Sequence, residues 1–336
     1  MKKIKRVILI SIPILAIIAA ILISSRKNEV REPAVIKPFI PEPNIPNDLK
    51  GPVQIKSSVN PTEFNFPQEA PLLQQKNKPL LSEEEAINIS KKFNFKSKPF
   101  IGEDALRGTA YIWSETTGSL NIYLKRGTVE YSLNGMPKII NKQLDDETKI
   151  QIAKDFVSNK LLTPTDNFEF VSLTYLKGSN KNSLEGLDVT NQKEATFTQI
   201  NFSPKVSQYS ILNFSGQETP IYVWLMSDGT VYKAHIQRLG EIAQTETKYP
   251  LKNYSDIISS LDKAIVVSFN NGNAYLPFVP TGFIKNIDVS EINLAYLLEK
   301  PDSELLQPVF LLKGKAVTTD NEKSTDVLLY LPAIKN

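Results

Sequence analysis

Residues 7–23 form the apolar run VILISIPILAIIAAILI, which only Ser11 and Pro13 interrupt. At about 1.5 Å of rise per residue, a helix of this length measures about 25 Å, close to the hydrocarbon thickness of a thin bilayer. The run therefore predicts a membrane anchor at residues 7–25, preceded by a short tail at residues 1–6. The rival interpretation is a secretory signal peptide that is later removed, although Ile23-Ser24-Ser25 is a poor cleavage site.

The basic residues around this run predict its orientation. Four cations precede it, and the two that follow, Arg26 and Lys27, are partly offset by Glu29. Because positive charge is retained on the inner side of a membrane, residues 1–6 are expected in the cytoplasm and the rest of the chain outside it. The predicted localisation is a single-pass protein of the cell membrane, held through Val7–Ile23.

Composition excludes several classes of function. The chain of 336 residues has a net charge of +3, and the six cations that flank the apolar run contribute more than this excess. The remainder is slightly acidic, so a nucleic-acid partner is not expected. No cysteine is present, which excludes disulfides and thiolate sites, and one histidine leaves no multi-histidine metal site. No metal and no cofactor are predicted.

Residues 26–80 form a proline-rich segment with no helical or strand period. Proline fixes φ and removes a backbone donor, so such a segment favours extended or irregular backbone. It is expected to be a spacer, either a passive stalk or a ligand for a proline-recognising module. Val53–Ile55 and Phe64–Phe66 are the parts of it expected to pack on the body.

The rest of the chain predicts three units of a helix followed by a strand meander, at residues 81–142, 143–248 and 249–336. The helices begin near Ser82, Asp145 and Asn253, and Ser82 with Glu85 forms a capping box. Helix followed by antiparallel meander predicts an α+β fold in which each helix covers a sheet face. The last two units are expected either as one lobe or as two.

The units also share a hairpin pattern of an apolar strand, a glycine and a second strand. It occurs at 122–129, 221–231 and 308–317, with the glycines Gly127, Gly229 and Gly314. Chance similarity among amphipathic hairpins is the rival explanation.

Two motifs in this body resemble a known family. Ser82-Glu83-Glu84-Glu85-Ala86 and Asp228-Gly229 are similar to the helix start and hairpin end of PepSY-type units. The whole layout resembles the YycI and YycH proteins, most closely at Tyr254–Ala264, Phe283–Leu298 and Gln307–Phe310. The resemblance implies an accessory protein that restrains or modulates a membrane sensor kinase. The long proline-rich segment departs from that family and puts direct kinase contact in doubt.

No catalytic constellation stands out in the sequence. The acidic clusters Glu83–Glu85 and Asp145–Glu147 could offer a carboxylate pair to a glycosidase, but their position at helix starts is explained by capping and the helix dipole. His235 lies on a strand between Lys233 and Arg238, as a surface or packed side chain rather than a base. The chain is therefore not expected to be an enzyme.

Aromatic residues on the hairpin strands are the candidate binding residues. A carbohydrate platform would use Trp113, Tyr123, Tyr222 and Trp224, whereas cross-strand packing is the ordinary role of such side chains. The leading hypothesis is a membrane-anchored, extracytoplasmic accessory protein that binds and modulates another envelope protein, with a sensor kinase as candidate. The alternative is a module that binds cell-wall polysaccharide or a small ligand. The sequence leaves the oligomeric state open.

Overall fold

The computed structural model describes residues 39–43, 53–76, 80–105, 107–135, 144–161, 167–180, 183–204, 206–213, 219–269, 284–300, 303–318 and 324–335. The chain divides into two compact units, Met1–Ile40 and Pro41–Asn336. Every element described below belongs to the second unit.

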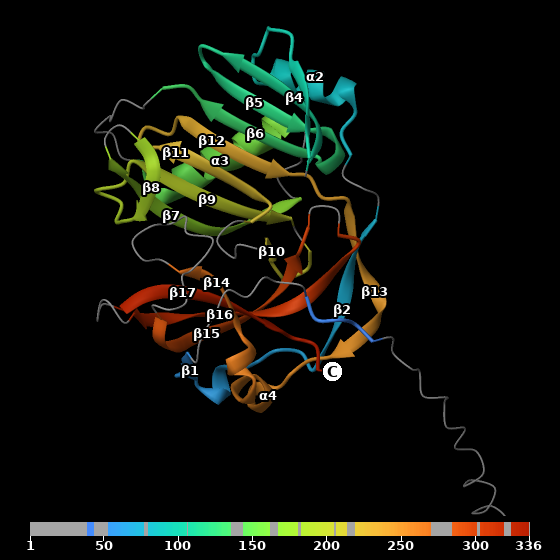
Figure 1. The fold of residues 1–336 in the computed structure, drawn as a ribbon, viewed down its shortest axis with the longest axis vertical. Helices are drawn as coiled ribbons and strands as arrows, with labels where there is room; N and C mark the ends of the chain where they lie inside the picture. Colours follow the sequence, from blue (N-terminus) through green and yellow to red (C-terminus); the bar gives the residue numbers. More distant parts are fainter. Residues whose placement is uncertain are drawn as a thin grey trace, which may run out of the picture. The chain divides into compact units, whose positions relative to one another are not determined.

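The expected fold class is wrong. The described residues are mostly β-strand, in one sheet of nine strands and one of eight, and their α-helices number three. Strands expected in the first and second units are hydrogen-bonded into the same nine-stranded sheet (Figure 1). The fold is therefore not a series of PepSY-like units that each pair one helix with its own sheet.

The nine-stranded sheet is antiparallel throughout. Its order from edge to edge is β3 (Phe100–Asp104), β4 (Gly108–Glu115), β5 (Gly118–Tyr123), β6 (Thr128–Leu133), β12 (Val231–Gln237), β11 (Ile221–Met226), β9 (Phe197–Pro204), β7 (Phe168–Asn180) and β8 (Ser183–Val189). The pairing of β6 with β12 joins the two sequence-local meanders, since His235 lies opposite Glu130.

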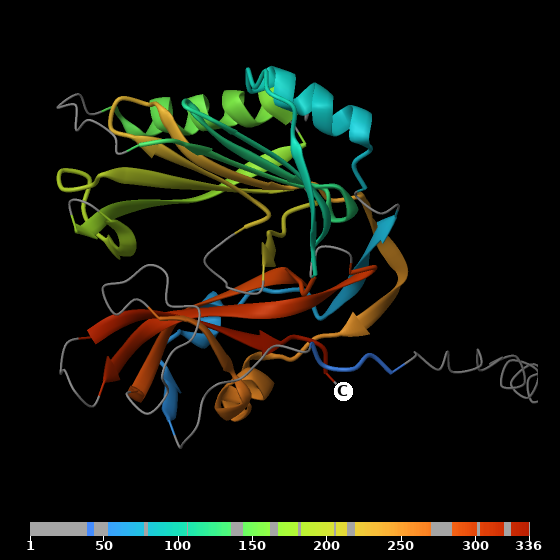
Figure 2. The same ribbon diagram turned by 45° about the horizontal axis from the view of Figure 1, so that its top comes forward.

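Two helices, α2 (Glu83–Lys92) and α3 (Asp146–Leu161), cover one face of this sheet (Figure 2). Ala86 and Ile89 of α2 and Ala153 and Val157 of α3 pack with the apolar side chains of the strands. The capping box that the sequence predicts for α2 is confirmed, because Glu85 N donates to Ser82 Oγ at 3.1 Å and Ser82 N donates to a Glu85 carboxylate oxygen at 2.9 Å. A cap of this kind satisfies backbone donors that the first helical turn leaves open.

The eight-stranded sheet is built around the long strand β15. Its main path is β1 (Gln54–Ser57), β15 (Ile284–Leu298), β16 (Leu305–Thr318), β17 (Ser324–Pro332) and β14 (Ile265–Phe269). β10 (Ile211–Asn213) and β1 both run parallel to β15, while β2 (Glu69–Lys76) pairs with β13 (Glu241–Pro250) and β16. The short helix α4 (Tyr254–Ser259) packs on this sheet through Ile257, and Asn253 caps it.

Residues of the proline-rich segment contribute to this sheet. They supply β1 and β2, and Val53, Ile55, Phe64 and Phe66 pack against its core as the sequence predicts. The remaining described part of that segment includes the short 3₁₀ helix Pro61–Glu63, capped by Asn60.

The hairpin pattern holds at two of its three positions. Gly127 and Gly229 have φ of 60° and 89°, the left-handed conformation that favours glycine in a turn. Gly314 instead lies inside β16, where a Cβ would come within 2.2 Å of the carbonyl oxygen of Asp288 on β15. The prediction of a third hairpin is therefore wrong. Gly314 allows two backbones to approach each other closely and does not form a turn.

The prediction of a single-pass membrane protein is also contradicted. Within the part of the chain that the structure describes, no helix combines the length and the apolar character needed to span a bilayer. The run Val7–Ile23, on which that prediction depended, lies outside the described residues.

Candidate functional site

The face of the nine-stranded sheet that the helices do not cover is unusually polar. One row crosses five paired strands, from Asn121 on β5 through Glu130, His235, Tyr222 and Asn201. We call this side of the sheet the polar face. Because side chains alternate along a strand, the neighbours of these positions, such as Val129 and Val223, point to the helices. The polar face also carries apolar residues, among them Phe197 and Met226.

Part of the polar face is a chain of buried hydrogen bonds. Trp224 Nε1 donates to Gln199 Oε1 at 3.0 Å, Gln199 Nε2 donates to Asn201 Oδ1 at 2.9 Å, and Asn201 Nδ2 donates to Ser172 Oγ at 3.0 Å. Gln199 and Asn201 are 5% and 2% exposed. Buried polar groups are stable only when they are paired, so this chain of contacts holds β11, β9 and β7 in one register.

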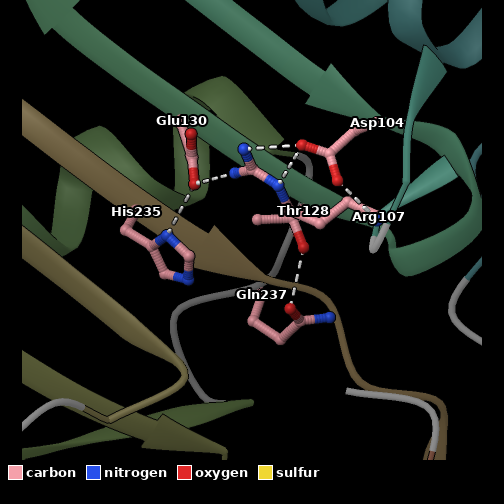
Figure 3. Close-up of polar contacts among 6 residues, drawn as sticks. All are labelled: Asp104, Arg107, Thr128, Glu130, His235 and Gln237. Atoms are coloured by element: carbon pink, nitrogen blue, oxygen red, sulfur yellow. Dashed lines mark hydrogen bonds and ion pairs between the residues drawn. The ribbon is translucent and has the colours of Figure 1, made fainter. Parts of the chain in front are cut away.

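Arg107 is the centre of a second, charged network at the other end of the polar face (Figure 3). Its guanidinium contacts Asp104 Oδ2 through two nitrogens, at 3.0 and 3.1 Å, and donates to Glu130 Oε1 at 3.2 Å. The backbone N–H of Arg107 also donates to Asp104 Oδ1 at 2.8 Å. The guanidinium carbon lies 3.8 Å from the ring centroid of Tyr123, a cation–π contact. Four contacts therefore fix one long side chain in a single orientation.

His235 extends this network across β12. Its Nδ1 lies 3.6 Å from Glu130 Oε1, and its ring stacks on Tyr222 with centroids 5.0 Å apart and planes 9° from parallel. Two positions away, the Lys233 ammonium lies 4.8 Å from the ring centroid of Trp224. Where β6 begins and β12 ends, Thr128 Oγ1 donates to Gln237 Oε1 at 2.8 Å (Figure 3).

The surroundings of Glu130 keep it ionised. Burial acts to raise the pKa of Glu130, but the hydrogen bond to His235 and the charges of His235, Arg107 and Lys233 together hold that pKa below its ordinary value. For Arg107, burial acts to lower the pKa, and the contacts with Asp104 and Glu130 outweigh it, so that the pKa is raised. Both groups therefore stay charged at neutral pH.

Five charged or ionisable residues of the polar face are partly accessible. Side-chain exposure is 35% for Arg107, 30% for Glu130, 28% for Asp104 and 20% for His235. With the half-buried Lys233 they form what we call the charged patch, which contains two carboxylates, two permanent cations and a histidine. Carboxylates accept and guanidinium and ammonium groups donate, so this surface can recognise polar groups of either sign.

The charged patch does not have the geometry of a catalytic triad. The nitrogen of His235 that a carboxylate places is Nδ1, and among the described residues no serine or threonine hydroxyl is hydrogen-bonded to the ring. Among the described residues, no three or more histidine, cysteine, aspartate or glutamate side chains are grouped closely enough to hold a metal ion.

The four aromatic candidates of the sequence lie on both faces of the sheet. Trp113 is 2% exposed and packs in the core beneath the helices, whereas Tyr123, Tyr222 and Trp224 lie on the polar face. These three are 4–5% exposed. They support the charged patch from beneath and beside it rather than forming an open platform.

The acidic clusters lie at helix starts, as predicted. Glu85 belongs to the capping box of α2, and Asp145 Oδ1 accepts from the backbone N–H of Thr148 at 2.7 Å. The pKa of Asp145 is lowered, mainly by that backbone hydrogen bond.

Asp104, Arg107 and Glu130 were not predicted as site residues. They are separated by up to 26 positions, and β12 adds Lys233 and His235 from a further hundred positions away. The available signal was a charged residue at outward positions of both β6 and β12. It becomes informative only when these two strands are known to be neighbours.

Comparisons with known proteins inform the fold alone. No protein-family model matches the chain, and a search of curated proteins finds no match either. Among solved structures, the chain is similar to the crystal structure of an uncharacterized protein from Eubacterium rectale, with a TM-score of 0.51 and 14% sequence identity. The similarity covers 80% of this chain and 85% of that one, and at this sequence identity it concerns the fold alone.

Proposed function

We propose that this chain is a non-enzymatic binding module that recognises a partner protein through the charged patch. The observation that carries the proposal is Arg107, which is fixed by Asp104, Glu130 and Tyr123 and still has 35% of its side chain exposed. Arginine and aromatic residues dominate the energetics of protein interfaces, and side chains that are ordered before binding lose less entropy on association.

The composition of the patch supports a protein partner over a saccharide. Saccharides are commonly bound on exposed aromatic rings, but Tyr222 and Trp224 are only 5% and 4% exposed. Charged groups of both signs within one hydrogen-bond network suit the side chains of another protein, since charge complementarity provides specificity. A sensor kinase is one partner to test, suggested by the short motifs Ser82–Ala86 and Asp228-Gly229 alone, because the observed fold does not share the layout of tandem PepSY-like units.

The partner can be identified by site-specific photocrosslinking of the full chain in its native cells. A photoreactive residue replaces Ser132, a half-buried position on β6 beside Lys233. The control replaces exposed Lys91 at the end of α2, on the side of the sheet that the helices cover. We expect a protein adduct at position 132 that is missing at position 91.

Binding of that partner is then measured with purified Arg107→Lys and Lys91→Ala variants. Arg107→Lys keeps the charge but removes the two-nitrogen contact with Asp104, so we expect about tenfold or greater loss of affinity. Lys91→Ala should bind like the natural chain. The proposal is wrong if Arg107→Lys binds unchanged, or if position 132 yields no protein adduct. A saccharide adduct, or sugar-dependent changes in tryptophan fluorescence, would support the ligand-binding alternative.

A further inference from the structure

The strand β3 is an open edge of the nine-stranded sheet. It pairs with β4 on one side, and in the described part of the chain no strand pairs with its other side. An edge of this kind presents unpaired N–H and C=O groups and is a template for another strand. Its first two residues are apolar and exposed, Phe100 by 70% and Ile101 by 53%. Natural edge strands usually avoid such exposed apolar residues, so β3 is a candidate interface.

The sequence of this edge is complementary to itself. Residues 98–104 read KPFIGED, with a cation at one end, two apolar residues in the middle and two carboxylates at the other end. An antiparallel copy reverses this order and therefore places opposite charges beside each other. A second copy supplies this reversed charge order by symmetry, whereas another partner strand would need it in its own sequence.

We propose that β3 pairs antiparallel with β3 of a second copy of this chain, in the register that places Ile101 opposite Ile101. The two-fold axis then passes through this residue pair, and the contact is isologous, as in most homodimers. The two nine-stranded sheets form one continuous sheet, and the helices of both copies lie on the same side of it.

Each neighbouring position fits this register. Lys98 faces Asp104 of the copy, so each lysine adds a second cation beside a carboxylate that already contacts Arg107 of its own chain. Phe100 faces Gly102 of the copy. Within one chain the Phe100 ring already lies against Gly102, because a Cβ there would be 3.1 Å from Phe100 Cε1. In the dimer, each Phe100 ring lies between Gly102 of its own chain and Gly102 of the copy, and it fills the space that the missing glycine side chains leave in the sheet.

Two features limit the strength of the contact. Pro99 has no N–H to donate, so the ladder ends near it, which is a common position for proline in an edge strand. A pair of five-residue strands is also small beside a standard interface, and we expect a dissociation constant of about 10 to 100 μM. The dimer shares Asp104 with the charged patch, whereas Arg107, Glu130, Lys233 and His235 lie outside β3.

The experiment uses the absence of cysteine from the chain. Single variants Ile101→Cys and Glu103→Cys are oxidised mildly in the full chain. Residues directly opposite in an antiparallel pair are about 4.5–5.5 Å apart at Cα, within disulfide reach, whereas copies of residue 103 would be about 13 Å apart along the strand. We expect covalent dimers with Ile101→Cys and few with Glu103→Cys.

Sedimentation analysis of the full chain between about 5 and 500 μM measures the association itself. We expect Ile101→Lys to weaken it about tenfold or more, and Lys98→Glu to weaken it less, with Leu80→Lys as a control of equal exposure. Equal crosslinking at positions 101 and 103 would show association through another surface and would overturn the proposal. A chain that stays monomeric across the whole range would overturn it as well.

Discussion

The two sheets differ in the kind of residue that lies on their second face. The nine-stranded sheet buries one face under α2 and α3, and its other face combines paired polar residues with a smaller apolar cluster around Phe197 and Met226. The eight-stranded sheet carries apolar clusters on both sides: Phe310 and Leu312 belong to one, and Val309 and Leu311 belong to another. Because successive side chains of a strand point to opposite faces, these four consecutive residues of β16 show that both faces are apolar.

This difference indicates where stability and where recognition reside. An apolar face contributes free energy in proportion to its buried area, and it has little capacity to discriminate among ligands. A polar face contributes little net stability, because each protein hydrogen bond replaces one with water, but it fixes the positions of donors and acceptors. The eight-stranded sheet is accordingly expected to be the stable base, and the nine-stranded sheet to carry the binding surface.

The largest effect is expected from Phe310→Ala in the eight-stranded sheet. Phe310 is fully buried and packs on Phe64 and Phe66, with centroids 6.0 and 5.8 Å away. Removing the ring deletes buried apolar surface and leaves a cavity, so we expect the unfolding free energy to fall by about 3–5 kcal/mol. Denaturant unfolding measures this, with Phe310→Leu as a milder control. A loss below about 1 kcal/mol would mean that this face is not a stabilising core.

A smaller effect is expected from Asn201→Leu on the polar face. The substitution keeps a similar size but deletes the acceptor of the Gln199 Nε2 hydrogen bond and the donor to Ser172 Oγ. Loss of these two hydrogen bonds is expected to lower the unfolding free energy by about 1–3 kcal/mol. The same denaturant experiment tests it. If Asn201→Leu is neutral or stabilising, the polar row has no structural role and the contrast between the sheets is overstated.

The smallest effect is expected from Glu130→Gln, and it should depend on pH. The folded-state pKa of Glu130 is depressed, so its contribution to stability is present above the unfolded pKa of about 4.3 and is lost as pH falls through the lower folded value. We expect the unfolding free energy of the variant to be lower by less than about 1 kcal/mol at pH 7 and to equal that of the natural chain at the acid end of the range.

Thermal unfolding between pH 7 and pH 3 measures this difference. Glu147→Gln, an exposed carboxylate at the start of α3, is the matched control. A Glu130→Gln deficit that stays constant across this range would show that the loss is steric rather than electrostatic.

Much of the secondary structure was predictable because its signals are local. The Ser82–Glu85 capping box, the cap at Asn253 and the turns at Gly127 and Gly229 each depend on residues within a few positions of one another. Gly314 was misinterpreted because a glycine in a turn and a glycine beside a second backbone give the same local pattern.

The charged patch was not predictable in the same way. Its central contact joins Arg107 to Glu130, and Glu130 to His235, which is 105 positions away in the sequence. The sequence named His235 and the aromatic residues around it, but it could not tell that Trp113 points to the core while Tyr222 and Trp224 point to the polar face.

What the sequence by itself determined about this chain is the position of its helix caps, its glycine turns and most of its strands, because short-range sterics and hydrogen bonds decide them. Which strands become neighbours was decided only by the tertiary structure, which merged two expected units through the pairing of β6 with β12 and built a second sheet around β15. The physical reason is that strand pairing links residues far apart in the sequence, and the gain from burying a whole sheet face exceeds any local preference for separate units.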